Sequence, residues 1–135
     1  MCFVENGLSL SEFECRELLA STSVGRVSLT IGALPVVLPV HYACSGESFV
    51  FRMNDSPAQR AVSLGKIIAL GVDNAHVADM FWAVVVIGRT VEMEPLVARD
   101  ELRTLGWARP TGYEQPHYVR LLPDVIEGTR TTRTV

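Results

Sequence analysis

Three strand-like segments near the start of the chain follow one another with very short gaps, and this spacing restricts the fold more than any other feature. Residues Val24–Ile31 alternate polar and apolar side chains, as a half-buried strand does. A turn at Gly32-Ala33 leads to the apolar segment Leu34–Ala43, and Ser45-Gly46 leads to Ser48–Met53. Because parallel neighbours need a crossover of about a dozen residues or more, the three segments are predicted to pair antiparallel.

Four further strand-like segments follow, at Ile67–Asp73, Phe81–Glu94, His117–Leu122 and Val125–Thr131. The longest of them contains Gly88, which predicts a bulge or the close approach of another backbone. Pro123-Asp124 separates the last two segments, so we expect a pair of strands there. Six or seven antiparallel strands, one of them long enough to bend at a glycine, close most easily into a small barrel.

Short helices are predicted at three places. Over Ser9–Ala20, two serines are each followed three residues later by a glutamate, which is a helix-capping pattern. Pro57 suits the first turn of a helix over Ala58–Leu64, and Pro95 opens a helix that runs to about Leu105. The chain of 135 residues has the usual size of one domain, so we expect residues 1–135 to form a single, mainly β domain.

The segment Leu34–Ala43 carries apolar side chains on both faces, as a strand covered on both sides does. It also contains Pro35 and Pro39, which have no backbone N–H to donate to a sheet. Both prolines are therefore predicted to lie at an edge, at a bulge or at a rim where a ligand approaches.

Composition and charge exclude several classes of function. Hydrophobic residues make up 48% of the chain and charged residues 20%, which indicates a folded protein. The net charge of −3 offers no basic field for a nucleic acid backbone. Residues 1–10 lack the basic start of a targeting segment, and no apolar run approaches the roughly 20 residues of a membrane span. We expect a cytoplasmic protein that binds neither nucleic acid nor membrane.

Familiar catalytic and metal-binding motifs are missing from the sequence. The three histidines are far apart, and none has a second ligand at the spacing of a metal site, so no metal is expected. The three cysteines form no CxxC pair, which argues against a zinc knuckle or a disulfide framework. The nucleophile elbow, the P-loop and the dinucleotide-binding glycine motif are also absent. The sequence identifies no catalytic residue.

The stretch Leu34–Arg60 offers a candidate anion site. A strand ends at Arg52, a loop containing Ser56 follows, and a short helix then carries Arg60. Guanidinium forks and helix N–H groups brought together in this way suit a phosphate. The alternative is that both arginines are solvated surface charges, which are common and contribute little.

Two further residues have an ordinary structural explanation beside a functional one. Trp82 is either a large apolar anchor at the rim of the core or part of a binding site. His41, on an otherwise apolar strand, is more often a half-buried imidazole than a catalyst.

Six segments of the sequence, in this order, resemble the recurrent segments of the pyridoxamine 5′-phosphate oxidase-like, FMN-binding split-barrel proteins. They are LLASTSVGRVSL, LPVVLPVHY, SFVFRMNDSPAQRAVSL, IALGVDN, FWAVVVIGRTVEME and YVRLLPDVIEGTR. The resemblance covers nearly the whole chain. It implies a small antiparallel split β-barrel with two or three short helices, and a homodimer that holds a flavin in a groove between its subunits.

The resemblance also implies which residues bind the cofactor. The residues expected along the isoalloxazine ring are Pro39, Val40, His41 and Tyr42. Those on the strand that contacts the ring edge and the phosphate are Val50, Phe51, Arg52 and Met53. Arg60 stands where the family commonly has a lysine for the phosphate, and Ser56 is a neutral donor beside it. Trp82 and Val84 match a Trp-Ser-Val segment in which Ala83 replaces the serine, so one donor to the cofactor is missing.

This resemblance implies an FMN-dependent oxidoreductase that acts on an unidentified small molecule. Because a flavin carries the hydride chemistry itself, the protein needs no acid, base or nucleophile of its own. The ending EGTRTTRTV lacks the arginine- and tryptophan-bearing segment associated with pyridoxal phosphate binding, so we do not expect that substrate. Two alternatives remain open: a reductase that uses a deazaflavin coenzyme, and a flavin-binding or sequestering protein without turnover.

Overall fold

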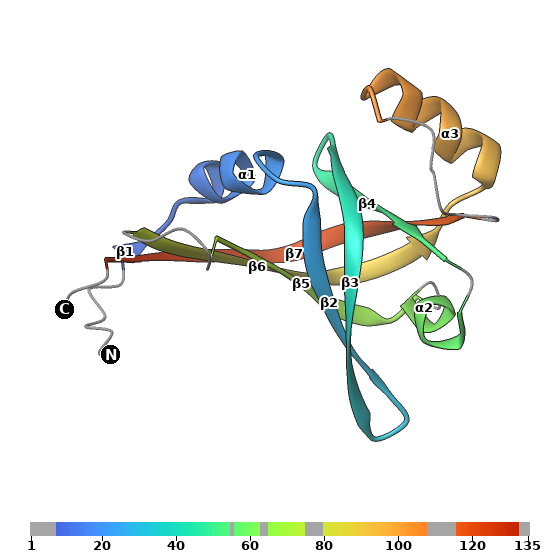
Figure 1. Cartoon of the computed structure of the whole chain (residues 1–135), viewed down its shortest axis with the longest axis horizontal. Helices are drawn as coiled ribbons and strands as arrows, with labels where there is room; N and C mark the ends of the chain where they lie inside the picture. The colour runs from blue at the N-terminus through green and yellow to red at the C-terminus, as the bar shows by residue number, and fades with distance from the viewer. Residues whose placement is uncertain (1–7, 55, 63–64, 75–79, 108–115, 133–135) are drawn as a thin grey trace.

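Seven strands and three helices make up the computed structural model, which describes residues 8–54, 56–62, 65–74, 80–107 and 116–132 (Figure 1). The strands are β1 (Leu8–Ser9), β2 (Val24–Ile31), β3 (Leu34–Ser45), β4 (Ser48–Met53), β5 (Ile67–Asp73), β6 (Met80–Glu92) and β7 (His117–Thr132). The helices are α1 (Glu12–Ala20), α2 (Pro57–Val62) and α3 (Pro95–Thr104). No helix in the described part of the chain combines the length and the apolarity that a membrane span requires.

The strands form one antiparallel sheet that closes on itself. Its order is β1-β7-β4-β3-β2-β5-β6, and β6 pairs in turn with β7. Both hairpins of the opening prediction are present, with Ile31 paired to Leu34 and Ser45 paired to Ser48. The predicted fold class, a mainly β antiparallel split barrel with two or three short helices, is confirmed, and the described helices are three.

Element boundaries follow the sequence pattern closely where turn residues mark them. The predicted bounds of β2, β4 and β5 match the structure. Helix α1 begins at Glu12 rather than Ser9, because Ser11 is the residue whose side chain accepts the Glu14 N–H and caps the helix. Leu8 and Ser9 instead pair with β7 as a short strand, for which the sequence carries no pattern long enough to predict it.

The end of the chain departs from the prediction, because β7 is one continuous strand and not a pair. Gly88 on β6 lies opposite Pro123 while Ile87 lies opposite Val125, so Asp124 is an extra residue in β7. A bulge of this kind accommodates a proline without ending the strand. The predicted close approach at Gly88 is confirmed, since a Cβ built there would lie 2.0 Å from the Leu122 carbonyl oxygen.

The interior of the barrel is apolar. Large side chains that are fully buried come from all the long strands and from α1: Leu19, Val27, Tyr42, Phe49, Phe51, Ile68, Leu70, Val84, Val86 and Leu121. Helix α1 packs Cys15 and Leu19 against this core, and the Tyr42 hydroxyl donates a hydrogen bond of 2.6 Å to the Leu19 carbonyl. This bond ties α1 to the inner side of β3.

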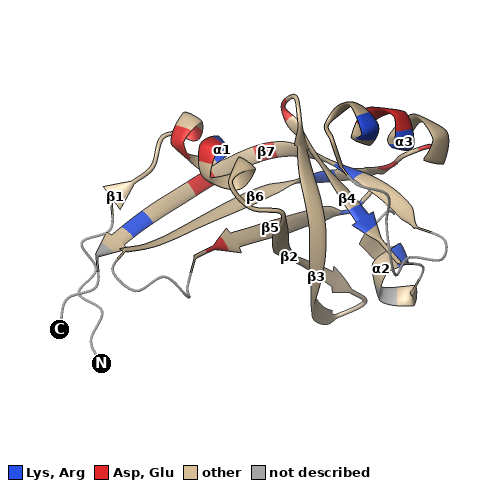
Figure 2. Ribbon diagram, turned by 45° about the horizontal axis from the view of Figure 1, so that its top comes forward, with Lys and Arg blue, Asp and Glu red and all other residues tan. Residues whose placement is uncertain are grey.

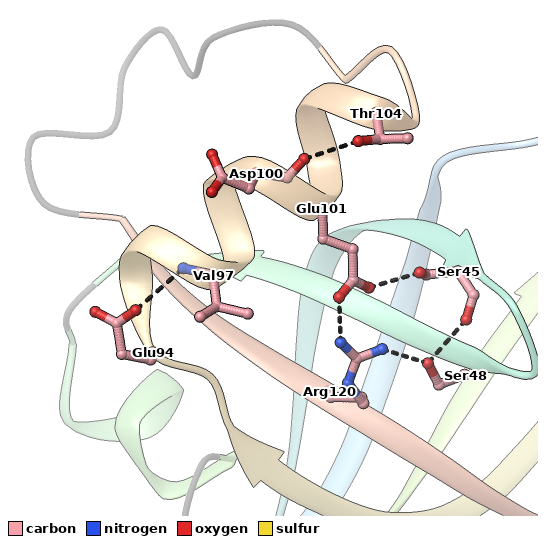
Figure 3. A network of polar contacts seen from close by, with 8 residues as sticks. All are labelled: Ser45, Ser48, Glu94, Val97, Asp100, Glu101, Thr104 and Arg120. Atoms are coloured by element: carbon pink, nitrogen blue, oxygen red, sulfur yellow. Dashed lines mark hydrogen bonds and ion pairs between the residues drawn. The ribbon is translucent and has the colours of Figure 1, made fainter.

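Helix α3 covers part of the outside of the barrel. Its Ala98 and Leu102 pack with Val50, Met93 and Tyr118 in a second buried cluster. Beside that cluster, Glu101 on α3 pairs with Arg120 on β7 and accepts a hydrogen bond of 2.5 Å from the Ser45 hydroxyl (Figure 3). Apolar packing and this polar network together fix α3 against β3, β4 and β7.

The two prolines of β3 lie on an open edge, as predicted. β4 pairs with β3 only from His41 to Ser45, whereas β2 pairs with β3 from Leu34 to His41. Pro35 and Pro39 therefore lie on the part of β3 that extends past β4 in a long hairpin with β2 (Figure 1). The barrel is split at the point where β3 and β4 part.

Candidate functional site

A cavity of about 220 Å³ lies where β3 parts from β4. The residues that line it are Val24, Pro39, Val40, His41, Arg52, Asn54 and Gln59. They come from β2, from β3, from the end of β4, from the connection that follows β4 and from α2. The lining joins apolar groups to a guanidinium, an imidazole and two amides, which suits a ligand that is partly flat and apolar and partly anionic.

Arg52 is the central charged group of this cavity. On β4, Phe51 and Met53 face the barrel core, so Arg52 faces outward, level with His41 on β3 and Tyr118 on β7. Its guanidinium carbon lies 4.1 Å from the centre of the Trp107 ring, in a cation–π arrangement. Arg52 is half-buried, which strengthens its attraction for an anion relative to a fully solvated arginine.

The polar wall opposite β3 is built by the turn that leads into α2. The Asn54 backbone N–H donates to the side-chain oxygen of Gln59. The Gln59 backbone N–H donates in turn to the Ser56 hydroxyl, at 3.2 Å. These local bonds hold Asn54 and Gln59 at the cavity.

Arg60 is an exposed residue of α2 and does not line the cavity. Figure 2 shows basic residues on β4 and α2 near one another, while α1 and α3 carry acidic residues as well as basic ones. Basic residues of two neighbouring elements therefore lie at this end of β4.

The other residues proposed from the resemblance lie in several different environments. Pro39, Val40, His41 and Arg52 line the cavity. The side chains that face the barrel core are those of Tyr42, Phe51, Met53 and Val84. Trp82 is partly buried against the same core, and Val50 is buried under α3.

Four residues near this site were not assigned to it from the sequence: Val24, Asn54, Gln59 and Trp107. Asn54 belongs to the turn already recognised as a possible anion corner, so the turn itself was the available signal. Trp107 lies more than 50 positions from Arg52 in the sequence, and only the packing of α3 brings the two side chains together.

Two of the described cysteines, Cys15 and Cys44, are free thiols. Burial raises the pKa of the Cys15 and Cys44 thiols, which keeps them protonated and poorly nucleophilic at neutral pH. Over the described ranges, no group of three His, Cys, Asp or Glu side chains is arranged to hold a metal ion.

A family model described as pyridoxamine 5′-phosphate oxidase matches residues 11–130. The chain belongs to the pyridoxamine 5′-phosphate oxidase family. The match spans nearly every described element, from α1 to most of β7. No curated protein sequence matches this family member.

Solved structures similar to this family member include flavin-binding proteins. An FAD-binding protein from Mycobacterium smegmatis has a TM-score of 0.82 and 23% identity, over 94% of this chain and 100% of that one. A candidate pyridoxamine 5′-phosphate oxidase from Corynebacterium glutamicum has a TM-score of 0.76 and 25% identity, over 96% of both chains. An FAD-binding protein from Mesorhizobium loti has a TM-score of 0.76 and 21% identity, over 94% of this chain and 99% of that one.

Proposed function

We propose that this protein binds a flavin nucleotide, FMN in the first instance, with the phosphate at Arg52, and serves as an oxidoreductase for a small molecule. The observation that carries the proposal is the half-buried Arg52 guanidinium in the wall of a cavity whose other side is apolar. A flavin nucleotide has the matching halves: a flat ring system and a phosphate. Membership of the pyridoxamine 5′-phosphate oxidase family supports the same ligand class.

The volume of the cavity supports a cofactor that is shared between two copies of the chain. Pockets for drug-sized ligands usually enclose about 300–1,000 Å³. The cavity of one chain measures about 220 Å³, so it encloses only part of such a ligand. A second copy would supply the remaining cover.

An apolar surface next to the cavity supports the same dimer. On the outer face of the sheet, Val37 is 62% exposed, Ile67 63% and Ile87 37%. The register places Val37 and Ile87 in one row across the sheet, because Val37 pairs with Ser28, Ser28 with Ala69 and Ala69 with Ile87. Ile67 lies two residues before Ala69, on the same face of β5. The sequence predicted that β3 is covered on both faces, and in one chain the Val37 face is open. We propose that a second copy covers this surface.

Within such a site, the bound flavin would supply the hydride chemistry. The chain itself would do three things: Arg52 would fix the phosphate, the Pro39–His41 edge would orient the ring, and apolar side chains would exclude water. Ala83 lies on the same outer face of the sheet, next to Asp73 in the register, and offers no side-chain donor. Binding would therefore depend more heavily on the phosphate end.

The proposal is tested by the absorbance spectrum of the purified protein, followed by separate titrations with FMN, FAD and a deazaflavin coenzyme. We expect tight FMN binding and reduction of the bound flavin by a nicotinamide nucleotide. If the protein bound only the deazaflavin coenzyme, that coenzyme would replace FMN as the proposed cofactor. Binding without reduction would indicate a sequestering protein, and a failure to bind any of the three would contradict the proposal.

The dimer is tested by light scattering on an Ile87→Glu variant, because a charge on the proposed contact surface would prevent association. Leu96 provides the control, since it is 66% exposed on α3 and lies away from that surface. We expect Ile87→Glu to be monomeric and to lose FMN affinity, and Leu96→Glu to behave as the wild type. A wild-type protein that is monomeric with FMN bound would contradict the shared site.

A further inference from the structure

Trp107 lies three residues beyond the end of α3 and makes a cation–π contact with Arg52, the charged group of the cavity. The Arg52 guanidinium carbon is 4.1 Å from the ring centre, well inside the roughly 6 Å range of an effective cation–π contact. A cation–π contact holds the guanidinium through its charge, whereas an anion is bound by hydrogen bonds from the guanidinium N–H groups. The contact with Trp107 therefore restrains Arg52 by a different kind of interaction from the one that an anion would make.

The position of Trp107 is itself fixed by the end of α3. Its backbone N–H donates to the Leu102 carbonyl at 2.9 Å, and the preceding residue, Gly106, has a φ of 76° that turns the chain back. The indole also packs against the buried cluster that includes Leu102 and Tyr118. The ring is thus held by backbone and by packing, on the side of Arg52 that faces α3.

Helix α3 is in turn fastened to the barrel by a polar network. Arg120 donates to Glu101 at 2.5 Å and to the Ser48 hydroxyl at 2.6 Å (Figure 3). The contacts therefore run from β7 through Glu101 and α3 to Trp107, and from Trp107 to Arg52.

We propose that Trp107 is a positioning residue that holds the Arg52 guanidinium for a phosphate and so sets the preference of the site for phosphorylated flavins over riboflavin. This inference rests on the proposed flavin site. It assigns to Trp107 a role in selecting the ligand, in addition to its packing in the α3 cluster. Without the ring, the Arg52 side chain is less restrained, and more of its conformational entropy must be lost each time a phosphate binds.

The experiment measures dissociation constants for FMN and for riboflavin, and takes their ratio as the phosphate preference. The variants are Trp107→Leu, which removes the ring, and Trp107→Phe, which keeps an aromatic face toward Arg52. Leu96→Ala, at an exposed position of the same helix, is the control. Circular dichroism and thermal melting verify that each variant is folded.

We expect Trp107→Leu to lower the phosphate preference by about fivefold, mostly through weaker FMN binding. Trp107→Phe should keep the preference within about twofold of the wild type. An unchanged phosphate preference in folded Trp107→Leu would overturn the inference. This includes an equal loss of affinity for FMN and for riboflavin, which would indicate a purely structural role for the ring. An equal loss of preference in the Leu and Phe variants would also overturn it, since the aromatic face would then be irrelevant.

These outcomes are separate from failure of the proposed function. If the wild type binds neither FMN nor riboflavin, the flavin site itself is wrong. If the wild type binds FMN with a phosphate preference that Arg52→Ala abolishes and Trp107→Leu leaves intact, the flavin site stands and the role of Trp107 falls.

Discussion

Glu101 on α3 and Arg120 on β7 form an ion pair of 2.5 Å, and both side chains are 25% exposed. The hydrogen bonds donated by Arg120 and by Ser45 hold the pKa of Glu101 below its usual value of 4.5. The pair is enclosed enough to escape much of the solvent screening that weakens surface ion pairs. It joins the α3 helix, and through it Trp107, to the barrel.

We predict that this pair adds an acid-sensitive component to stability. A carboxylate whose pKa is lower in the folded state stabilises the fold above its unfolded pKa of about 4.5, and this contribution is lost as the pH falls through the folded value. Glu101→Gln should lower the free energy of unfolding by about 1 kcal/mol at pH 7. Denaturant titrations at pH 7 and at pH 3 should show the difference from wild type shrinking at the lower pH.

Asp100 provides the matched control for this prediction. It neighbours Glu101 on α3 and pairs with Arg103 at 3.4 Å, but both of those side chains are at least 75% exposed. Asp100→Asn should change stability by less than about 0.5 kcal/mol at either pH. An effect as large as that of Glu101→Gln would mean that the network around Arg120 contributes no more to stability than an exposed ion pair does.

We predict that Gly88→Ala is strongly destabilising. The added Cβ would lie 2.0 Å from the Leu122 carbonyl oxygen, and a backbone atom of the neighbouring strand cannot move aside cheaply. A loss of about 2–3 kcal/mol in the free energy of unfolding is expected from such overpacking. Urea denaturation followed by circular dichroism measures it.

Gly71→Ala is the comparison for Gly88→Ala, because Gly71 lies on the neighbouring strand β5. Its nearest contact for an added Cβ is the Arg26 carbonyl at 3.9 Å, which is an ordinary distance. We expect a change of less than about 1 kcal/mol. Equal losses in the two variants would show that glycine flexibility, and not the close approach at the bulge, is responsible.

We predict that Tyr42→Phe destabilises the protein by about 1–2 kcal/mol, because it leaves the Leu19 carbonyl without the hydroxyl that now donates to it at 2.6 Å. Burial also raises the pKa of this phenol, so the hydroxyl stays protonated as a donor over the neutral range. Hydrogen exchange of the α1 amides provides the measurement. Faster exchange throughout α1 is expected, and unchanged exchange would contradict the role of this bond.

Much of the barrel follows from local sequence rules. The Gly32-Ala33 and Ser45-Gly46 turns, together with regular alternation, were sufficient to predict the bounds of β2 and β4. The pattern failed at Pro123, where a proline normally ends a strand. There the proline is tolerated because Gly88 lies opposite Pro123 and the next residue, Asp124, is extra in β7. Such a bulge depends on two strands that are far apart in the sequence.

The candidate site was also predictable only where local sequence pattern marks its residues. Arg52 could be chosen because it ends an apolar strand just before a turn, and the cavity includes it. Arg60 appeared equivalent in the sequence, yet the short helix α2 places it in an exposed position that does not line the cavity. Trp107 could not be found from local pattern, since its contact with Arg52 depends on how α3 packs on the barrel.

Arg52→Ala tests the central claim most directly, because that claim assigns the phosphate of a bound flavin to one side chain. The measurement is the dissociation constant for FMN in the wild type, in Arg52→Ala and in Arg103→Ala, an arginine whose side chain is 79% exposed on α3. We predict a loss of about tenfold or more, at least about 1.4 kcal/mol, in Arg52→Ala and almost none in Arg103→Ala. Equal FMN affinities in wild type and folded Arg52→Ala would contradict the account.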